Sequence, residues 1–252
     1  DTLLTDGGNV GIFRTIACIG DSLSSGEFEG TGSEGQKTYH DMYDYSWGQY
    51  MARLAGCKVY NFSRGGMNAR WYLDSFGDER GLWNHDLASQ AYIMALGVND
   101  ISDAVRNNTD LGSIEDIDPA DWRNNKRSFI GDYARILQRY REIAPDSYFF
   151  LMTIPRNGQN NERTPLEEQH RDLLYALAEL FPNVFVLDLR AYAPVYDDAF
   201  RHQYFLGGHM NPMGYLLTAR MVVSYIDYII RSDMRRFAQV GFINTPWKNT
   251  AQ

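Results

Sequence analysis

The sequence of 252 residues contains only two cysteines, Cys18 and Cys57. Two cysteines cannot build a disulfide framework, and neither has the spacing of a metal site. Cys18 lies within the first apolar run and Cys57 comes just before the second, so we expect both to be small, buried hydrophobic side chains. The sequence leaves open whether they form a disulfide.

The sequence also lacks long apolar runs and long runs of one charge. No apolar run approaches the roughly 18 residues of a membrane-spanning helix. The chain has 24 basic and 32 acidic residues, hence a net charge of −8, and no five like charges follow one another. Nucleic acids and anionic membranes favour clustered Lys and Arg, so the composition argues against both as main partners.

The chain begins at Asp1 rather than at a methionine. Removal of a signal peptide would leave such a start and would indicate a secreted or periplasmic protein, whereas removal of a tag would leave it too. The sequence does not distinguish the two, and it does not indicate an oligomeric state.

Apolar residues make up 44% of the chain, enough for a sizeable core, and no linker or internal repeat divides it. We therefore expect one domain over residues 1–252. Three of five strand-like runs are almost continuously apolar, which is typical of parallel strands buried on both faces. The five expected strands are Thr15–Ile19, Lys58–Asn61, Tyr92–Leu96, Tyr148–Thr153 and Val184–Leu187.

Helical segments with readable caps separate these runs. Strands that alternate with helices predict an α/β fold, a three-layer sandwich with a five-stranded parallel sheet. The polar stretch from Ser102 to Arg127 shows no periodicity and is predicted to be a lid or an irregular excursion. The expected helices are Trp47–Leu54 behind the cap Ser46, Phe129–Ile143, a helix from the cap Thr164 to about Phe181, and one from Asn211-Pro212 to about Arg231.

Small polar residues follow four of the expected strands. Ligands of open parallel sheets bind beyond the carboxyl ends of the strands, so these residues would meet at one edge. A serine hydroxyl becomes a good nucleophile when an imidazole takes its proton, and the oxyanion that forms needs fixed N–H donors. The residues are Gly20-Asp21-Ser22 after the first strand, Gly65-Gly66 after the second, Asn99 after the third, and His209 some way after the fifth.

The blocks "GDSLSSG", "NFSRGG", "GVND" and "GGHMNP", in this order, resemble those of the SGNH or GDSL hydrolase superfamily. The resemblance covers residues 15 to about 230 and implies a flavodoxin-like sheet and the cleavage of esters or thioesters. It implies Ser22 as nucleophile, with its own N–H in the oxyanion hole, and His209 as base. Gly66 would give a backbone donor and Asn99 a side-chain donor, while Asp21, Gly65 and Trp71 would lie against the substrate.

One position departs from the pattern of that family. An aspartate commonly lies three residues before the histidine, and Leu206 stands there instead. An imidazole in the wrong tautomer costs roughly 10⁴ in rate, so something else must orient His209. A backbone carbonyl of the Leu206–Gly208 loop and a displaced acid, Asp197 or Asp198, are equally good candidates.

The sequence offers weaker indications of the substrate. Six loop aromatics would pack beneath the loops or, alternatively, form a platform for a sugar ring. No loop is rich in Leu, Ile and Phe, so we expect acetyl esters of carbohydrates rather than long-chain lipids. A catalytically impaired glycan-binding protein and a lipid or thioester acyl hydrolase are the alternatives. The other histidines lack ligand spacing, so neither a metal nor a cofactor is expected. The six aromatics are Tyr39, Tyr43, Tyr45, Trp71, Tyr72 and Trp83.

Overall fold

The computed structural model describes residues 2–250. It contains a parallel sheet of five strands in the order β4-β1-β5-β6-β7. Numbered along the chain, this order is 2-1-3-4-5, the flavodoxin-like arrangement, and its direction reverses beside β1. The α/β prediction is confirmed. The strands are β1 (Thr15–Gly20), β4 (Lys58–Ser63), β5 (Ala91–Ala95), β6 (Tyr148–Met152) and β7 (Val184–Leu187).

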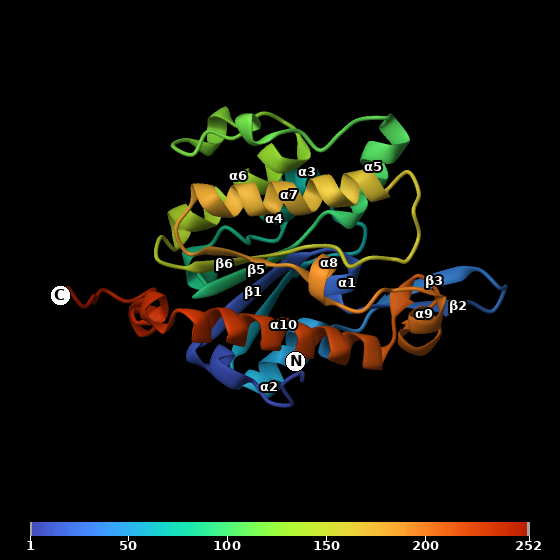
Figure 1. Ribbon diagram of the computed structural model, residues 1–252, viewed down its shortest axis with the longest axis horizontal. Coiled ribbons are helices and arrows are strands. Elements are labelled where there is room, and N and C mark those ends of the chain that lie inside the picture. Colours follow the sequence, from blue (N-terminus) through green and yellow to red (C-terminus); the bar gives the residue numbers. More distant parts are fainter. Residues whose placement is uncertain (1, 251–252) are drawn as a thin grey trace.

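Helices cover both faces of the sheet (Figure 1). One face carries α3 (Ala69–Trp71), α4 (Gly77–Glu79), α5 (Val98–Asn107), α6 (Phe129–Ile143) and α7 (Thr164–Leu180). The other carries α2 (Trp47–Ala55) and α10 (Pro212–Ser232). Two short helices continue from β7, namely α8 (Leu189–Tyr192) and α9 (Asp198–Tyr204).

The alternation of side chains along β1 feeds a separate core on each face. Ala17 and Ile19 pack among residues of α6, while Ile16 and Cys18 pack beneath the sheet among residues of α2 and α10. Strands buried on both faces explain why the sequence runs are continuously apolar rather than alternating. No helix within residues 2–250 is long and apolar enough to cross a membrane.

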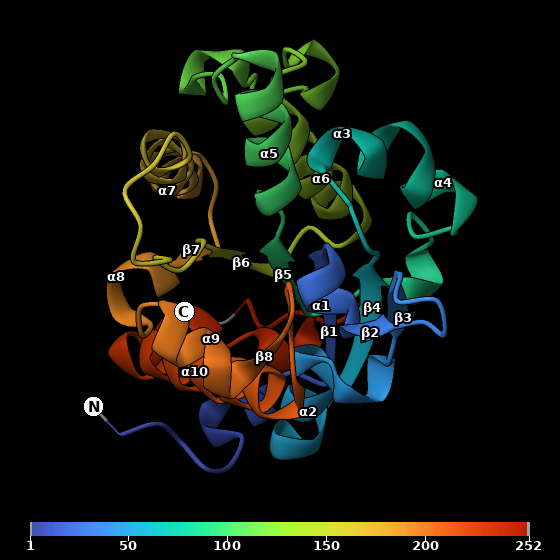
Figure 2. The same cartoon turned by 90° about the vertical axis from the view of Figure 1, so that its right-hand side faces the viewer.

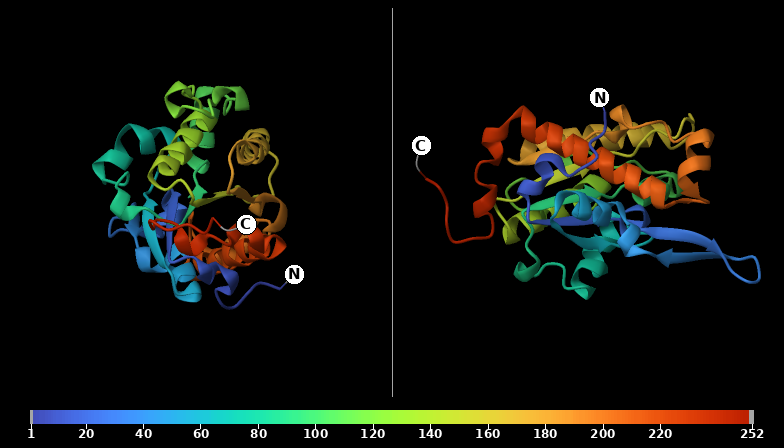
Figure 3. Two further views of the ribbon diagram at one scale, coloured as in Figure 1. Left: turned by 90° about the vertical axis from the view of Figure 1, so that its left-hand side faces the viewer. Right: turned by 90° about the horizontal axis from the view of Figure 1, so that it is seen from below.

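One short helix and two small hairpins lie at the carboxyl edge of the main sheet, which faces the viewer in Figure 2. The nearest to the sheet is the four-residue helix α1 (Ser22–Ser25), which follows β1 directly. The antiparallel hairpin of β2 (Glu27–Thr31) and β3 (Lys37–Asp41) projects from the body of the protein (Figure 3). A tighter hairpin of β8 (Phe205–Leu206) and β9 (His209–Met210) contacts β2.

Short helical turns complete the chain between these elements. All are 3-10 turns except a π-helical turn over Tyr72–Phe76. The 3-10 turns are Gly8–Ile12, Tyr43–Tyr45, His85–Leu87, Ile114–Asp116, Trp122–Asn124, Met234–Phe237 and Val240–Phe242.

Three details correct the expectations from sequence. Thr164 is the first residue of α7 rather than its cap: the cap position is Arg163, and the Thr164 hydroxyl accepts the N–H of Asn161. The segment from residue 102 is not irregular throughout, because α5 continues to Asn107 and two 3-10 turns follow. Both cysteines are free thiols, Cys18 buried and Cys57 partly so. The caps Ser46 and Asn211 are confirmed.

Candidate functional site

Ser22 begins α1 at the turn that ends β1. The Asp21 carboxylate caps this helix by accepting the N–H of Leu23 at 2.9 Å. The turn is tight because Gly20 has no side chain: a Cβ there would lie 2.4 Å from Ser24 Oγ. The Ser22 hydroxyl makes no hydrogen bond within the described part of the chain and therefore remains available to a substrate.

Two loops beside Ser22 hold the expected oxyanion donors. Gly66, after β4, has a φ of +74°, a conformation that favours glycine. Neither its N–H nor that of Ser22 is bonded to another group among residues 2–250, so both can serve a ligand. Asn99 lies in the first turn of α5, where its Nδ2 donates to Met67 O at 2.9 Å and lies 3.4 Å from Asp21 Oδ2. The switch point of the sheet thus lies between Ser22 and Asn99.

His209 lies in β9 beside strand β2. Its Nε2 is 3.1 Å from Glu27 Oε1, and its Nδ1 is 3.7 Å from Glu29 Oε2. The ring of Tyr39 stands edge-on to the imidazole, with 5.7 Å between the ring centroids. No hydrogen bond joins His209 to Ser22 within residues 2–250. Catalytic hydrogen bonds often form only once substrate has bound, so the absence of this hydrogen bond is compatible with a role of His209 as general base.

Neither of the two aspartates that the sequence suggested accompanies His209. Asp197 caps α9 by accepting the N–H of Phe200 at 2.9 Å, and Asp198 is exposed in the first turn of that helix. Among the described residues no ion pair or hydrogen bond connects either carboxylate, or a carbonyl of residues 206–208, to the imidazole of His209. Leu206 is exposed and offers no acid.

The three residues expected to lie against the substrate, Asp21, Gly65 and Trp71, each have different surroundings. Asp21 is buried as a cap beneath the turn. A Cβ on Gly65 would lie 2.3 Å from Glu27 Oε2, so this glycine admits the carboxylate. Trp71 lies beside Gly66, where a Cβ would be 3.8 Å from its ring, and the Arg64 guanidinium stacks 5.2 Å from that ring.

The six loop aromatics fall into two groups. Tyr72 is fully buried, Trp83 and Trp71 pack against the same core, and Tyr43 donates its hydroxyl proton to Val59 O. Tyr39 and Tyr45 are exposed. Packing is the main role of the first group, of which only Tyr72 is fully buried, and the exposed pair is the more accessible to a ligand.

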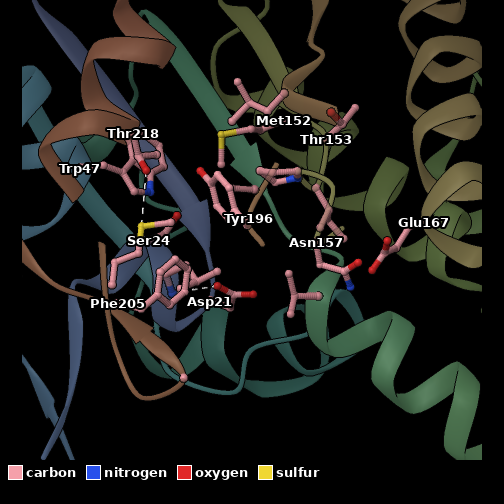
Figure 4. Close-up of a pocket in the computed structure, with 18 of the residues that line it drawn as sticks. Asp21, Ser24, Trp47, Met152, Thr153, Asn157, Glu167, Tyr196, Phe205 and Thr218 are labelled. Atoms are coloured by element: carbon pink, nitrogen blue, oxygen red, sulfur yellow. Dashed lines mark hydrogen bonds between the residues drawn. The ribbon is translucent and has the colours of Figure 1, made fainter. Parts of the chain in front are cut away.

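A cavity of about 360 Å³ lies beside the turn that carries Ser22, over the carboxyl ends of β5 and β6. Asp21 and Glu167 stand on opposite sides of it, and Tyr196 and Phe205 face into it (Figure 4). Its lining is mainly apolar, with Arg163 and Arg201 among the few charged groups. No pattern in the sequence indicated this cavity, because its walls come from segments far apart in the chain.

Burial dominates the electrostatics of the site. It raises the pKa of Asp21 to about 7 although the N–H of Leu23 opposes the shift. Burial likewise raises the pKa of Asp100, one residue after Asn99, to about 7. The pKa of Glu27 is raised by burial and held back by the neighbouring His209. No cluster of three His, Cys, Asp or Glu side chains that could hold a metal ion occurs in the part of the chain described.

The sequence reasoning missed Glu27 and Glu29. The alternation Glu27-Phe28-Glu29 is the signal that could have revealed them, since it places both carboxylates on one face of a strand. Phe28, on the other face, packs against Tyr45 and Tyr215. That alternation indicates a strand with acidic side chains on one face and an apolar side chain on the other.

Comparisons with known proteins identify the family and the fold of the chain. Residues 18–217 match the model of the GDSL-like lipase/acylhydrolase family. A comparison with curated proteins gives no match. The fold is similar to that of a family two carbohydrate esterase from Clostridium thermocellum solved with cellohexaose, at 16% identity, with 88% of this chain and 65% of that chain covered and a TM-score of 0.59.

Two further solved structures share the fold. One is a carbohydrate esterase family 2 enzyme of Corynascus thermopiles with its carbohydrate binding domain, at 14% identity, with 86% and 67% of the two chains covered and a TM-score of 0.57. The other is a carbohydrate acetylesterase of Sinorhizobium meliloti, at 15% identity, with 86% and 99% covered and a TM-score of 0.54. With the family match spanning most of the sequence, the chain belongs to the GDSL-like lipase/acylhydrolase family and is a carboxylic ester hydrolase.

Proposed function

We propose that this enzyme is a serine esterase that removes acetyl and other short acyl groups from carbohydrates. The observation that carries the proposal is the set of N–H donors around Ser22. The N–H groups of Ser22 and Gly66 have no internal acceptor among residues 2–250, and the Asn99 amide lies at the neighbouring strand end. Three donors beside one free hydroxyl are what acyl transfer requires.

In the proposed reaction Ser22 Oγ attacks the ester carbonyl while its proton passes to an imidazole nitrogen of His209. The carbonyl oxygen becomes an oxyanion bound by Ser22 N–H, Gly66 N–H and Asn99. As the C–O bond to the alcohol breaks, His209 returns the proton to the leaving oxygen. Water then attacks the acyl-serine by the same route and releases the acid, which restores the Ser22 hydroxyl.

The carbohydrate preference rests on the surface beside His209. Tyr39 is exposed, and its ring stands edge-on to the imidazole. Tyr45 is also exposed, and its ring packs against Phe28 of β2. An exposed tyrosine offers an apolar ring face together with a hydroxyl, which suits the face of a sugar. The structural neighbours named above include enzymes described as carbohydrate esterases, which supports the same substrate class.

The cavity beside Asp21 favours a second candidate, an acyl hydrolase for longer chains. Its mainly apolar lining could take an acyl chain that an acetyl ester does not have. The absence of an aspartate at position 206 favours a third candidate, a catalytically impaired glycan-binding protein. The Glu27 carboxylate beside His209 argues against this candidate.

A substrate panel tests the proposal. Acetylated xylose and glucose derivatives would be compared with p-nitrophenyl esters of two to twelve carbons, each with wild type and with Ser22→Ala. We expect acetyl esters to give the highest kcat/KM and Ser22→Ala to reduce kcat by about 10⁴-fold or more. A maximum at eight carbons or longer would favour the lipid or thioester alternative, and equal background rates for both proteins would favour the binding protein.

A further inference from the structure

The imidazole of His209 lies between two carboxylates of β2. The Glu27 carboxylate is at hydrogen-bond distance, 3.1 Å from Nε2, whereas Glu29 Oε2 is 3.7 Å from Nδ1. The side chains of His209 and Glu27 are 15% and 14% exposed, so both are largely shielded from water. A shielded carboxylate and a shielded imidazole each need a partner, and each finds it in the other.

The surrounding backbone makes room for Glu27. A Cβ on Gly65 would lie 2.3 Å from Glu27 Oε2, so only glycine at that position allows the carboxylate to occupy its place. The hydroxyl of Tyr215 donates to the backbone carbonyl of Glu27 at 2.6 Å and ties the start of β2 to helix α10. The carboxylate is thus held between the loop that carries Gly66 and the hairpin that carries His209.

Glu29 has different partners, although it lies on the same face of the strand. Its carboxylate accepts the N–H of Gly208 at 2.9 Å and pairs with Lys37 at 2.7 Å. These two contacts lower the pKa of Glu29. A separation of 3.7 Å from Nδ1 is too long for a hydrogen bond. Glu29 therefore fixes the loop that precedes His209 and does not hold the ring itself.

We infer that Glu27 is the positioning residue for His209 and takes the place of the acid that position 206 lacks. The inference rests on the proposed function, since it assigns a role in the reaction of Ser22. With the Nε2 proton directed at Glu27, the imidazole is held in one tautomer and its lone pair is left on Nδ1. This Nδ1 atom is buried and has no hydrogen-bond partner among the described residues.

Every proton in the attack of Ser22 on the ester is accounted for. The Ser22 O–H bond breaks as Oγ bonds to the carbonyl carbon, and the proton moves to the imidazole nitrogen that does not face Glu27. The resulting imidazolium keeps its other N–H against the ionised Glu27 carboxylate, which stabilises the positive charge. The imidazolium then gives the transferred proton to the leaving alkoxide, and Glu27 stays ionised throughout.

Three variants of the protein test the inference. Glu27→Gln keeps the shape of the side chain and removes its charge, and Glu27→Asp keeps the charge and shortens the side chain. Glu34→Gln, at the exposed turn of the same hairpin, is the control for removing one negative charge. We expect Glu27→Gln to lower kcat on p-nitrophenyl acetate at least about tenfold while KM and Tm stay close to wild type, because the defect lies in the base and not in binding. Glu27→Asp should retain more activity than Glu27→Gln, and Glu34→Gln should stay within about threefold of wild type.

Several results would overturn the inference. One is Glu27→Gln with wild-type kcat, and another is an equal or larger loss of kcat in Glu34→Gln. Equal or lower activity of Glu27→Asp would show that shape rather than charge matters, and a fall in Tm with a rise in KM would indicate a structural role alone. Ser22→Ala separates the two levels of the argument. If Ser22→Ala is inactive while Glu27→Gln is fully active, only the role of Glu27 fails; if Ser22→Ala is active, the proposed function itself fails.

Discussion

The Asn99 amide divides its two N–H groups between Met67 and Asp21. Nδ2 is 2.9 Å from the Met67 carbonyl oxygen and 3.4 Å from Asp21 Oδ2. The first contact fixes the plane of the amide against the loop after β4. The second is long and therefore weak, so the N–H directed toward Asp21 can be shared with an oxyanion at little cost. A buried aspartate with a raised pKa thus lies beside the side-chain donor that the mechanism requires.

Removing this donor should slow the chemical step. We expect Asn99→Ala to lower kcat by about 10²–10³-fold with a small change in KM, because an oxyanion donor acts mainly in the transition state. Asn107→Ala, at the exposed end of the same helix, is the control and should leave kcat unchanged. Steady-state kinetics on p-nitrophenyl acetate measures both. Loss of less than threefold in Asn99→Ala would remove Asn99 from the oxyanion hole.

Gly97 connects the core to the same donor. It has a φ of +138°, and a Cβ there would lie 2.4 Å from Nε2 of the buried His170. We expect Gly97→Ala to lower the free energy of unfolding by more than about 1 kcal/mol and to reduce kcat, since the clash must move either the ring or the turn that begins α5. Gly241→Ala, where a Cβ would meet open space, is the control. Wild-type stability in urea for Gly97→Ala would contradict this account.

The free energy of unfolding of the protein should depend on the ionisation of Asp100. Its pKa is raised to about 7, chiefly by burial, while an unfolded aspartate titrates near 4. Between about pH 4 and pH 7 the folded state therefore binds more protons than the unfolded state, so this group makes the free energy of unfolding fall as pH rises through that window. Asp100→Asn cannot ionise, and its stability relative to wild type should increase from pH 5 to pH 8.

Urea unfolding of the two proteins at pH 5 and pH 8 checks the sign. The Asp100→Asn side chain would keep the acceptor that Asp100 offers to Ala69 N–H at 2.9 Å and would place an amide nitrogen at the buried, unpaired Oδ2 position. The exposed Asp198→Asn is the control for removing one negative charge. A stability difference between wild type and Asp100→Asn that does not change with pH would show that Asp100 is ionised throughout.

Filling the cavity should separate short from long substrates. Ala95 lines the cavity at the end of β5, close to Asp21. We expect Ala95→Leu to leave acetate turnover within about threefold and to lower turnover of octanoate esters more strongly, because only the longer acyl chain needs the cavity. Overpacking can cost about 1–3 kcal/mol, so Tm is measured alongside. An equal loss on both esters at unchanged Tm would place the cavity outside acyl binding.

Sequence reasoning worked where local chemistry determines structure. Continuous apolar runs such as Tyr148–Met152 reveal buried strands, and the caps Ser46 and Asn211 set helix starts within a residue. The hairpin of β2 and β3 was not predicted, because its strands are polar and half-exposed and bury no continuous apolar face. A contact such as Glu27 with His209 depends on how that hairpin folds onto the loop after α9, which no short-range pattern encodes.

The site residues follow the same division. The positions of Ser22, Gly66 and Asn99 at one edge of the sheet could be predicted, because each lies within four residues of the end of a recognisable strand and strand ends converge in a parallel sheet. The suggestion of Asp197 or Asp198 rested on closeness to His209 in the chain. A carboxylate that immediately precedes a helix is occupied by the first N–H groups of that helix, and Asp197 makes that contact.

Covalent labelling tests the central claim most directly. The protein would be treated with a serine-directed fluorophosphonate, and the modified peptide would be identified by mass spectrometry beside the Ser22→Ala variant. The account predicts a single adduct on Ser22, loss of acetyl esterase activity in step with labelling, and no adduct in the variant. An adduct on another residue, or an unlabelled wild-type protein that still cleaves the ester, would contradict it.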